Sequence, residues 1–207
     1  GPWAGCTAAD DPGTNLTTVV QALGASTFES DDGNLLNDCD PDWVDVATSP
    51  DFARGDDLAP GSTDDSYGSG SKEDSLDPPI DFGSIPPNKS DLSRFYIFYE
   101  NVAGIDYLHF AWTRLNVLGT ANMSFEPNQS SLITPNGNPV RTEGDVLLTF
   151  DWSSGNKIVD LGALRWLTAG PCYGNGSKPP CWGDFQDLDQ AGYAEGAVND
   201  TASVYDP

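Results

Sequence analysis

Histidine, basic residues and long apolar runs are scarce in this sequence. Its 207 residues include one histidine, and 9 Lys and Arg stand against 32 Asp and Glu, which gives a net charge of -23. A field of this sign repels nucleic-acid phosphates and anionic lipid, so neither is expected as a partner. No apolar run reaches the roughly 18 residues that a membrane-spanning helix requires, so no membrane insertion is expected.

Motifs that position a nucleophile, a catalytic metal or a phosphate are also missing. The chain has no G-x-S-x-G, no H-E-x-x-H and no Gly-rich phosphate loop ahead of a helix. His109 lies between Leu108 and Phe110, a setting typical of a histidine in the core or at its rim. Paired carboxylates can hydrolyse glycosides, but some pair is inevitable among 32 acids. The sequence therefore predicts a protein that is not an enzyme.

Strand signals dominate over helix signals. Apolar or alternating segments of strand length recur after Asp91, separated by Gly, Asn and Pro turns. These segments are RFYIFYENV, DYLHFAWTRLNV, TANMSFEPNQ, VRTEGDVLLTFDW, KIVDLGALRWLT and GYAEGAVND. This rhythm predicts an all-β fold: a single antiparallel β-sandwich, jelly-roll-like, with under about 10% helix.

One domain is expected over residues 1–207, with the strand-rich region at 91–201. Residues 49–87 are dominated by Asp, Ser, Gly and Pro, so they are predicted to form a long acidic loop. A loop of that length is either a linker or a segment ordered by bound ions. The N-terminal portion has too few apolar residues to fold alone.

Four cysteines, Cys6, Cys39, Cys172 and Cys181, are even in number and have no C-x-x-C spacing. Three connectivities are open, and the pairs Cys6–Cys39 and Cys172–Cys181 are favoured because both close short loops. Disulfides indicate an oxidising, extracellular or cell-surface location. Four buried free thiols in a cytosolic protein are the alternative.

The acidic residues allow two interpretations, a solvated surface or ligands for Ca²⁺. Carboxylates and loop carbonyls are the hard oxygen ligands that Ca²⁺ takes, and the ion would replace missing hydrophobic contacts in an apolar-poor loop. Neither candidate cluster matches the EF-hand register. The candidate ligands are Glu29, Asp31, Asp32 and Asn34 in ESDDGN, and Glu73 and Asp74 in SKEDS, joined by Asp91.

The order of several segments resembles the N-terminal β-sandwich region of large modular secreted bacterial surface proteins, which precedes pilin-type, prealbumin-like repeats. The resemblance covers about residues 25–201 and implies architecture and location, with no catalytic residues to carry across. The first forty residues depart from the family pattern. The segments are GSIPPNKSDLSRFYIFYE, YLHFAWTRLNVLGTANMSFEPNQSS, VRTEGDVLLTFDW, LRWLT and PCWG, with STFESDDGNL, DWVDV and GSGSKEDS before them.

These observations predict a non-enzymatic extracellular structural or adhesive module of a cell-surface protein or extracellular fibre. Its partner would be a further copy of the chain or a surface ligand, a glycan included. The alternative is a calcium-assisted carbohydrate-binding module, because solvent-facing aromatic rings stack on sugars. The tryptophans considered for that role are Trp112, Trp152, Trp166 and Trp182.

Overall fold

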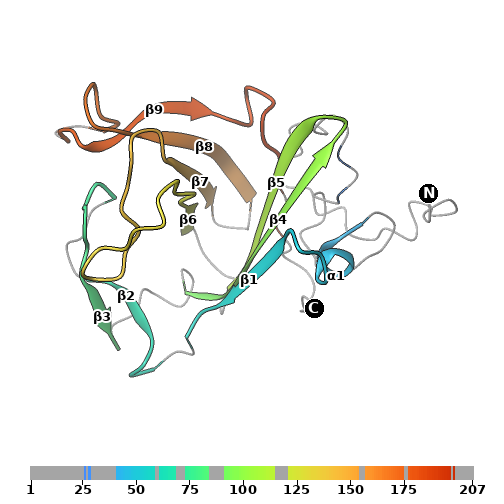
Figure 1. Ribbon diagram of the computed structural model, residues 1–207, viewed down its shortest axis with the longest axis horizontal. Helices are drawn as coiled ribbons and strands as arrows, with labels where there is room; N and C mark the ends of the chain where they lie inside the picture. The colour runs from blue at the N-terminus through green and yellow to red at the C-terminus, as the bar shows by residue number, and fades with distance from the viewer. Residues whose placement is uncertain are drawn as a thin grey trace, which may run out of the picture.

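The protein is all-β in a computed structural model. The structure describes residues 26, 28, 41–58, 61–68, 73–83, 91–114, 121–153, 157–174, 177–196 and 198. Of the described residues, 47% lie in strands and 3% in helix, and the sheets are antiparallel (Figure 1). The predicted all-β, sandwich-like fold class is confirmed. Among these residues no helix is long and apolar enough to cross a membrane.

The first sheet has three strands in the order β1-β4-β5. They are β1 (Phe52–Asp56), β4 (Leu92–Val102) and β5 (Ile105–Arg114). Ala103 and Gly104, with φ of 55° and 85°, form the two-residue turn of the β4–β5 hairpin. Positive φ at both central residues matches the right-handed twist of the flanking strands, which fixes the register of the hairpin.

One face of this sheet packs on the short helix α1 (Trp43–Val46). Asp42 caps the helix: its carboxylate accepts the Trp43 N–H, while the Asp45 carboxylate accepts the Asp42 N–H. Trp43 then lies against Phe28 and Tyr96, with ring centroids 5.0 and 5.7 Å away. The three rings are buried and form the first core.

The second sheet is a meander of four strands in the order β6-β7-β8-β9. They are β6 (Ala121–Phe125), β7 (Val146–Ser153), β8 (Lys157–Leu167) and β9 (Cys181–Asp187). Leu147, Leu164, Trp166 and Trp182 form the second core on one face of this sheet. The predicted C-terminal strand at 192–200 is not formed in its described residues, 192–196 and 198; β9 lies earlier, at the segment that follows the Pro-rich turn.

Three short strands lie in the region predicted to be a long loop. Besides β1, they are β2 (Asp65–Tyr67) and β3 (Ile80–Phe82), which pair into a two-stranded ribbon. Asp77, in the connection between them, accepts hydrogen bonds from Thr134 Oγ1 and Asn138 Nδ2 at 2.5 and 2.9 Å. The connection between β2 and β3 is therefore held by polar contacts to the 126–141 segment, which compensate for its few apolar residues.

Candidate functional site

A group of three carboxylates forms where the strands of two different sheets begin and end. Asp57 follows β1, Asp64 precedes β2 and Asp91 precedes β4. Oxygen atoms of the three carboxylates lie within 4.8 Å of one another, so the group could hold a metal ion. The Asp57 N–H donates to Ser93 O at 2.9 Å, which extends the β1–β4 ladder and sets Asp57 close to Asp91. The Gly83 N–H donates to Asp64 O at 2.8 Å and joins the ribbon to the group.

Like charges make this group electrostatically costly. Burial raises the pKa of Asp91, and the neighbouring carboxylates of Asp64 and Asp57 raise it further. Burial also raises the pKa of Asp57; the Leu58 N–H opposes this shift, while the charges of Asp64 and Asp65 add to it. A bound divalent cation would remove this repulsion, because it favours the charged form of each carboxylate.

The other predicted calcium ligands have different places. Glu73 and Asp74 do not join Asp91: Asp74 Oδ1 accepts the Trp182 N–H at 3.0 Å, and Glu73 O accepts the Trp182 indole N–H at 2.9 Å. Burial raises the pKa of Glu73, and Arg141 opposes the shift. The remaining four candidates, Glu29, Asp31, Asp32 and Asn34, lie outside the described residues.

A second group of carboxylates, not predicted from the sequence, lies at the β8–β9 pair. Its members, Asp160, Asp187 and Asp189, are half-buried and also lie within 4.8 Å of one another. Asp187 Oδ1 accepts the Gln190 N–H at 3.0 Å. This group could hold a metal ion as well, but backbone donors already satisfy part of it, as in an ordinary acidic turn.

The disulfide between Cys172 and Cys181 is present, as predicted. It closes the loop between β8 and β9 and anchors the start of β9, where Cys181 is fully buried. A disulfide of this kind is typical of proteins from oxidising compartments. The predicted Cys6–Cys39 pair lies outside the described residues.

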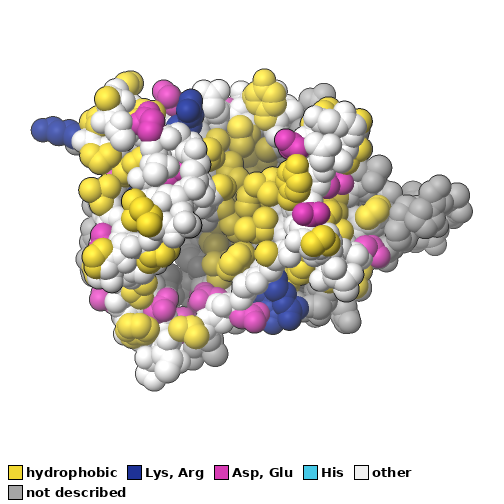
Figure 2. Space-filling model, viewed as in Figure 1, with side chains coloured by type: hydrophobic (Ala, Val, Ile, Leu, Met, Phe, Trp, Pro, Cys, Tyr) yellow, Lys and Arg dark blue, Asp and Glu magenta, His cyan; other side chains and the backbone are white. Residues whose placement is uncertain are grey.

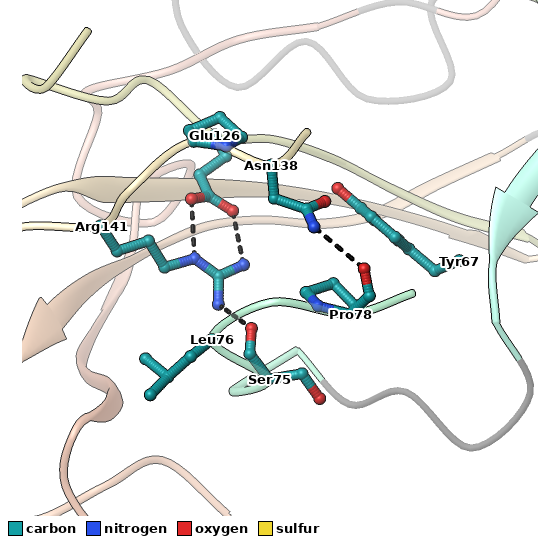
Figure 3. Close-up of a pocket in the computed structure, with 8 residues that line it drawn as sticks. Tyr67, Ser75, Leu76, Pro78, Glu126, Asn138 and Arg141 are labelled. Atoms are coloured by element: carbon teal, nitrogen blue, oxygen red, sulfur yellow. Dashed lines mark hydrogen bonds and ion pairs between the residues drawn. The ribbon is translucent and has the colours of Figure 1, made fainter. Parts of the chain in front are cut away.

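The residues that line a shallow pocket beside the β2–β3 ribbon connect several segments of the chain through polar contacts (Figure 3). Arg141 forms a bidentate ion pair with Glu126, with both N–O distances 2.7 Å, and donates to the carbonyls of Glu73 and Ser75 at 2.8 and 3.0 Å. Asn138 Nδ2 donates to Pro78 O at 2.9 Å in the same view. Since these groups satisfy one another, the pocket connects segments of the chain and offers few groups to a ligand.

Two of the tryptophans considered for carbohydrate binding are buried. Trp166 and Trp182 are 1% and 2% exposed, and the Arg141 guanidinium lies 4.8 and 5.0 Å from their ring centroids. Both rings are therefore committed to the core and to a cation–π contact. Trp112 is half-buried, and the side chain of Trp152 lies outside the described part.

An apolar cleft opens between the two sheets. On its first wall, the register of β4 and β5 puts Phe95, Tyr99 and Leu108 on one face. They are 37, 41 and 48% exposed. On the same face, Trp112 contacts Phe150 of the second sheet, with ring centroids 4.7 Å apart. Figure 2 shows the hollow, lined by hydrophobic side chains, between the hairpin and the second sheet. An exposed apolar surface of this kind is typical of an interaction site.

His109 lies on the opposite face of β5, as the alternation predicts. Its ring packs on Phe28 and Phe98, with centroids 4.4 and 5.7 Å away, and its Nε2 lies 3.1 Å from Glu100 Oε1. Burial lowers the pKa of His109, while the hydrogen bond and charge of Glu100 and the charge of Glu195 oppose the shift.

We therefore expect the pKa of His109 to lie below its ordinary value of 6.5. Because the folded-state value is depressed, this group's contribution to stability is full above the unfolded pKa and is lost as the pH falls through the folded value. An NMR titration of the single histidine measures it, and Glu100→Gln should lower the pKa further. A value at or above 6.5 in the wild-type protein would contradict the prediction.

Comparison with family models, with curated proteins and with solved structures finds no match to the chain.

Proposed function

We propose that the protein is a non-enzymatic extracellular module with a structural or adhesive role, as part of a cell-surface protein or extracellular fibre. The observation that carries this proposal is the apolar cleft between the two sheets. Its exposed side chains Phe95, Tyr99 and Leu108 suit binding by burial of apolar surface. The Cys172–Cys181 disulfide, the acidic composition and the resemblance to secreted surface proteins support the location.

The partner that fits this cleft is a protein segment with apolar and basic side chains. Asp106 lies on the cleft face of the hairpin and accepts a hydrogen bond from the Tyr99 hydroxyl at 2.7 Å. Acidic side chains flank the hollow in Figure 2. Since the whole chain carries a net charge of -23, two copies repel each other, whereas a basic partner is attracted.

The proposal includes Ca²⁺ as an ion that stabilises the fold. Two groups of three carboxylates in the described part could hold a metal ion. Oxygen-only donor sets favour hard cations, and extracellular modules bind Ca²⁺ with dissociation constants of about 10⁻⁴ to 10⁻³ M.

A direct test uses a synthetic peptide of alternating lysine and valine, with fluorescence anisotropy as the measurement. We expect a dissociation constant of roughly 10 µM at low salt and weaker binding at high salt. Leu108→Asp should weaken binding at least about tenfold, because it places a charge on the apolar wall. Phe82→Asp is the matched control, because Phe82 is an exposed apolar residue of β3, away from the hairpin.

Three results would overturn the partner assignment. One is equal binding of a peptide of alternating glutamate and valine, since the acidic rim should reject it. Another is ordered fibres of the purified chain in electron microscopy, which would show a second copy as the partner. The third is tight binding of one glycan on an array, with no peptide binding, which would favour the carbohydrate-binding alternative.

A further inference from the structure

Two carboxylates of the group that joins β1, β2 and β4 are buried with an unsatisfied oxygen. Asp64 is 0% exposed and Asp91 is 3% exposed. Neither Asp64 Oδ2 nor Asp91 Oδ2 has a hydrogen-bond donor among the residues that the structure describes. A buried carboxylate oxygen without a partner is strongly unfavourable, and a buried charge is normally paired or bound to a metal.

The group also gathers negative charge instead of dispersing it. The charges that act on Asp91 are those of Asp64 and Asp57, all carboxylates within the same 4.8 Å. The backbone donors of Asp65 and Leu58 satisfy one oxygen each of Asp64 and Asp57, at 2.9 and 2.8 Å. One oxygen of each carboxylate lies within 4.8 Å of the other two, as the ligands of a cation do.

We propose that Asp57, Asp64 and Asp91 bind a Ca²⁺ ion that connects the β2–β3 ribbon to the end of the β1–β4 ladder. This assignment rests on the proposed function, which includes a calcium ion, and it names the residues that bind that ion. The donors that the described residues supply are oxygens, which favours a hard cation over the Zn²⁺ or copper that sulfur and imidazole sets select. Ca²⁺ accepts irregular shells of 6–8 oxygens, whereas Mg²⁺ demands a near-ideal octahedron.

The bound ion would stabilise the β2–β3 ribbon. A two-stranded ribbon is marginally stable on its own in water. The connection between β2 and β3 is held by Asn138 and Arg141 on the 126–141 segment, and the opposite end of the ribbon, at Asp64 and Gly83, meets the carboxylate group. An ion at that end would fix the ribbon at both ends, since its ligands come from three separate segments of the chain.

The first experiment compares the melting temperature of the full chain in CaCl₂ and in EDTA. At a Ca²⁺ concentration of about 100 times the dissociation constant, we expect an increase of at least about 5 °C. Hydrogen exchange of β2 and β3 should slow by at least about tenfold when Ca²⁺ is added. Calcium titration in a calorimeter should give a single site at these carboxylates. An unchanged melting temperature would overturn the proposal, and an equal response to MgCl₂ would overturn the choice of ion.

Asp64→Asn separates a calcium ligand from a residue that only supports the fold. It should weaken Ca²⁺ binding at least about tenfold, while in EDTA its melting temperature should equal or exceed that of the wild type, because one of three repelling charges is gone. An equal loss of stability in both buffers would overturn the proposal. Asp57→Asn, at a half-buried member of the group, gives the same test if Asp64→Asn does not fold.

Asp187→Asn is the matched control, because Asp187 belongs to the other carboxylate group. It should leave the calcium response intact; loss of the response in this variant alone would move the site to β8–β9 and overturn the assignment. Leu108→Asp should also keep the calcium response. If the peptide did not bind but the calcium response were intact, the proposed function of the cleft would be refuted and the calcium site would be supported. If the peptide bound but Ca²⁺ had no effect, the calcium site would be refuted and the function of the cleft would be supported.

Discussion

Replacing Arg141 by methionine is expected to lower the free energy of unfolding by about 3 kcal/mol. The Arg141 side chain is 11% exposed, and its guanidinium is paired with Glu126. It also lies against the rings of Trp166 and Trp182 and donates to two carbonyls of the 73–75 segment. Methionine would fill much of the volume, but it would remove the Arg141 donor from the Glu126 carboxylate and from both carbonyls, of which Glu73 O keeps the Trp182 indole N–H. Removing one partner of a partly buried ion pair is costly.

Urea denaturation followed by tryptophan fluorescence measures this effect, since two of the affected rings are tryptophans. Arg141→Lys should recover less than half of the loss, because lysine keeps the charge but cannot form the bidentate pair. Arg165→Met on β8 is the control: Arg165 is exposed, so we expect a change within about 0.5 kcal/mol. If Arg141→Met and Arg165→Met lowered the free energy of unfolding equally, the role of Arg141 in connecting these segments would be refuted.

The hairpin that forms the first wall of the cleft is predictable from sequence. Period-two alternation in DYLHFAWTR separates the face of His109 from the face of Trp112, and the structure keeps both faces as expected. The Ala103–Gly104 turn supplies the register. Such local signals suffice because each strand pairs with its neighbour in the chain.

The sequence pattern does not predict β9, because CWGDFQD is short and interrupted by a glycine. Its strand conformation depends on tertiary contacts: the Cys172–Cys181 disulfide and the Trp166–Trp182 pair, whose ring centroids lie 5.1 Å apart. In short strands such tertiary contacts outweigh the intrinsic β-propensity of the residues. The 192–200 segment alternates more regularly, yet its described residues form no strand.

The sequence predicts the carboxylate group in part. Asp91 is among the predicted ligands, but its neighbours Asp57 and Asp64 are not, because sequence spacing does not show which strand ends meet in an antiparallel sheet. A usable signal exists: Asp57 and Asp91 each lie just outside a strand, and the antiparallel β1–β4 pairing puts both at one end. The role of Arg141 has no comparable signal, since its partners come from positions 73, 75, 126, 166 and 182.

Gly183→Val is expected to lower the free energy of unfolding by roughly 3 kcal/mol or more. Gly183 is buried in β9, where a Cβ atom would lie 2.4 Å from Leu167 Cδ1 and 2.6 Å from the carbonyl oxygen of Pro171. Leucine can change rotamer, but the Pro171 oxygen is backbone next to the disulfide at Cys172, so relief requires that the Cys172–Cys181 loop move away from the sheet.

The effect should be measured by urea denaturation with the disulfide intact, together with near-ultraviolet circular dichroism of the Trp166–Trp182 pair. Gln186→Val, at an exposed position of the same strand, is the control and should change stability by less than about 0.5 kcal/mol, since valine favours strands and the Gln186 side chain is exposed. Gly183→Ala should fall between the two, because it adds the clashing Cβ without the two further methyl groups. If Gly183→Val were as stable as Gln186→Val, the close packing of β9 against the disulfide loop would be wrong, and the anchoring of β9 would have to come from its pairing with β8 alone.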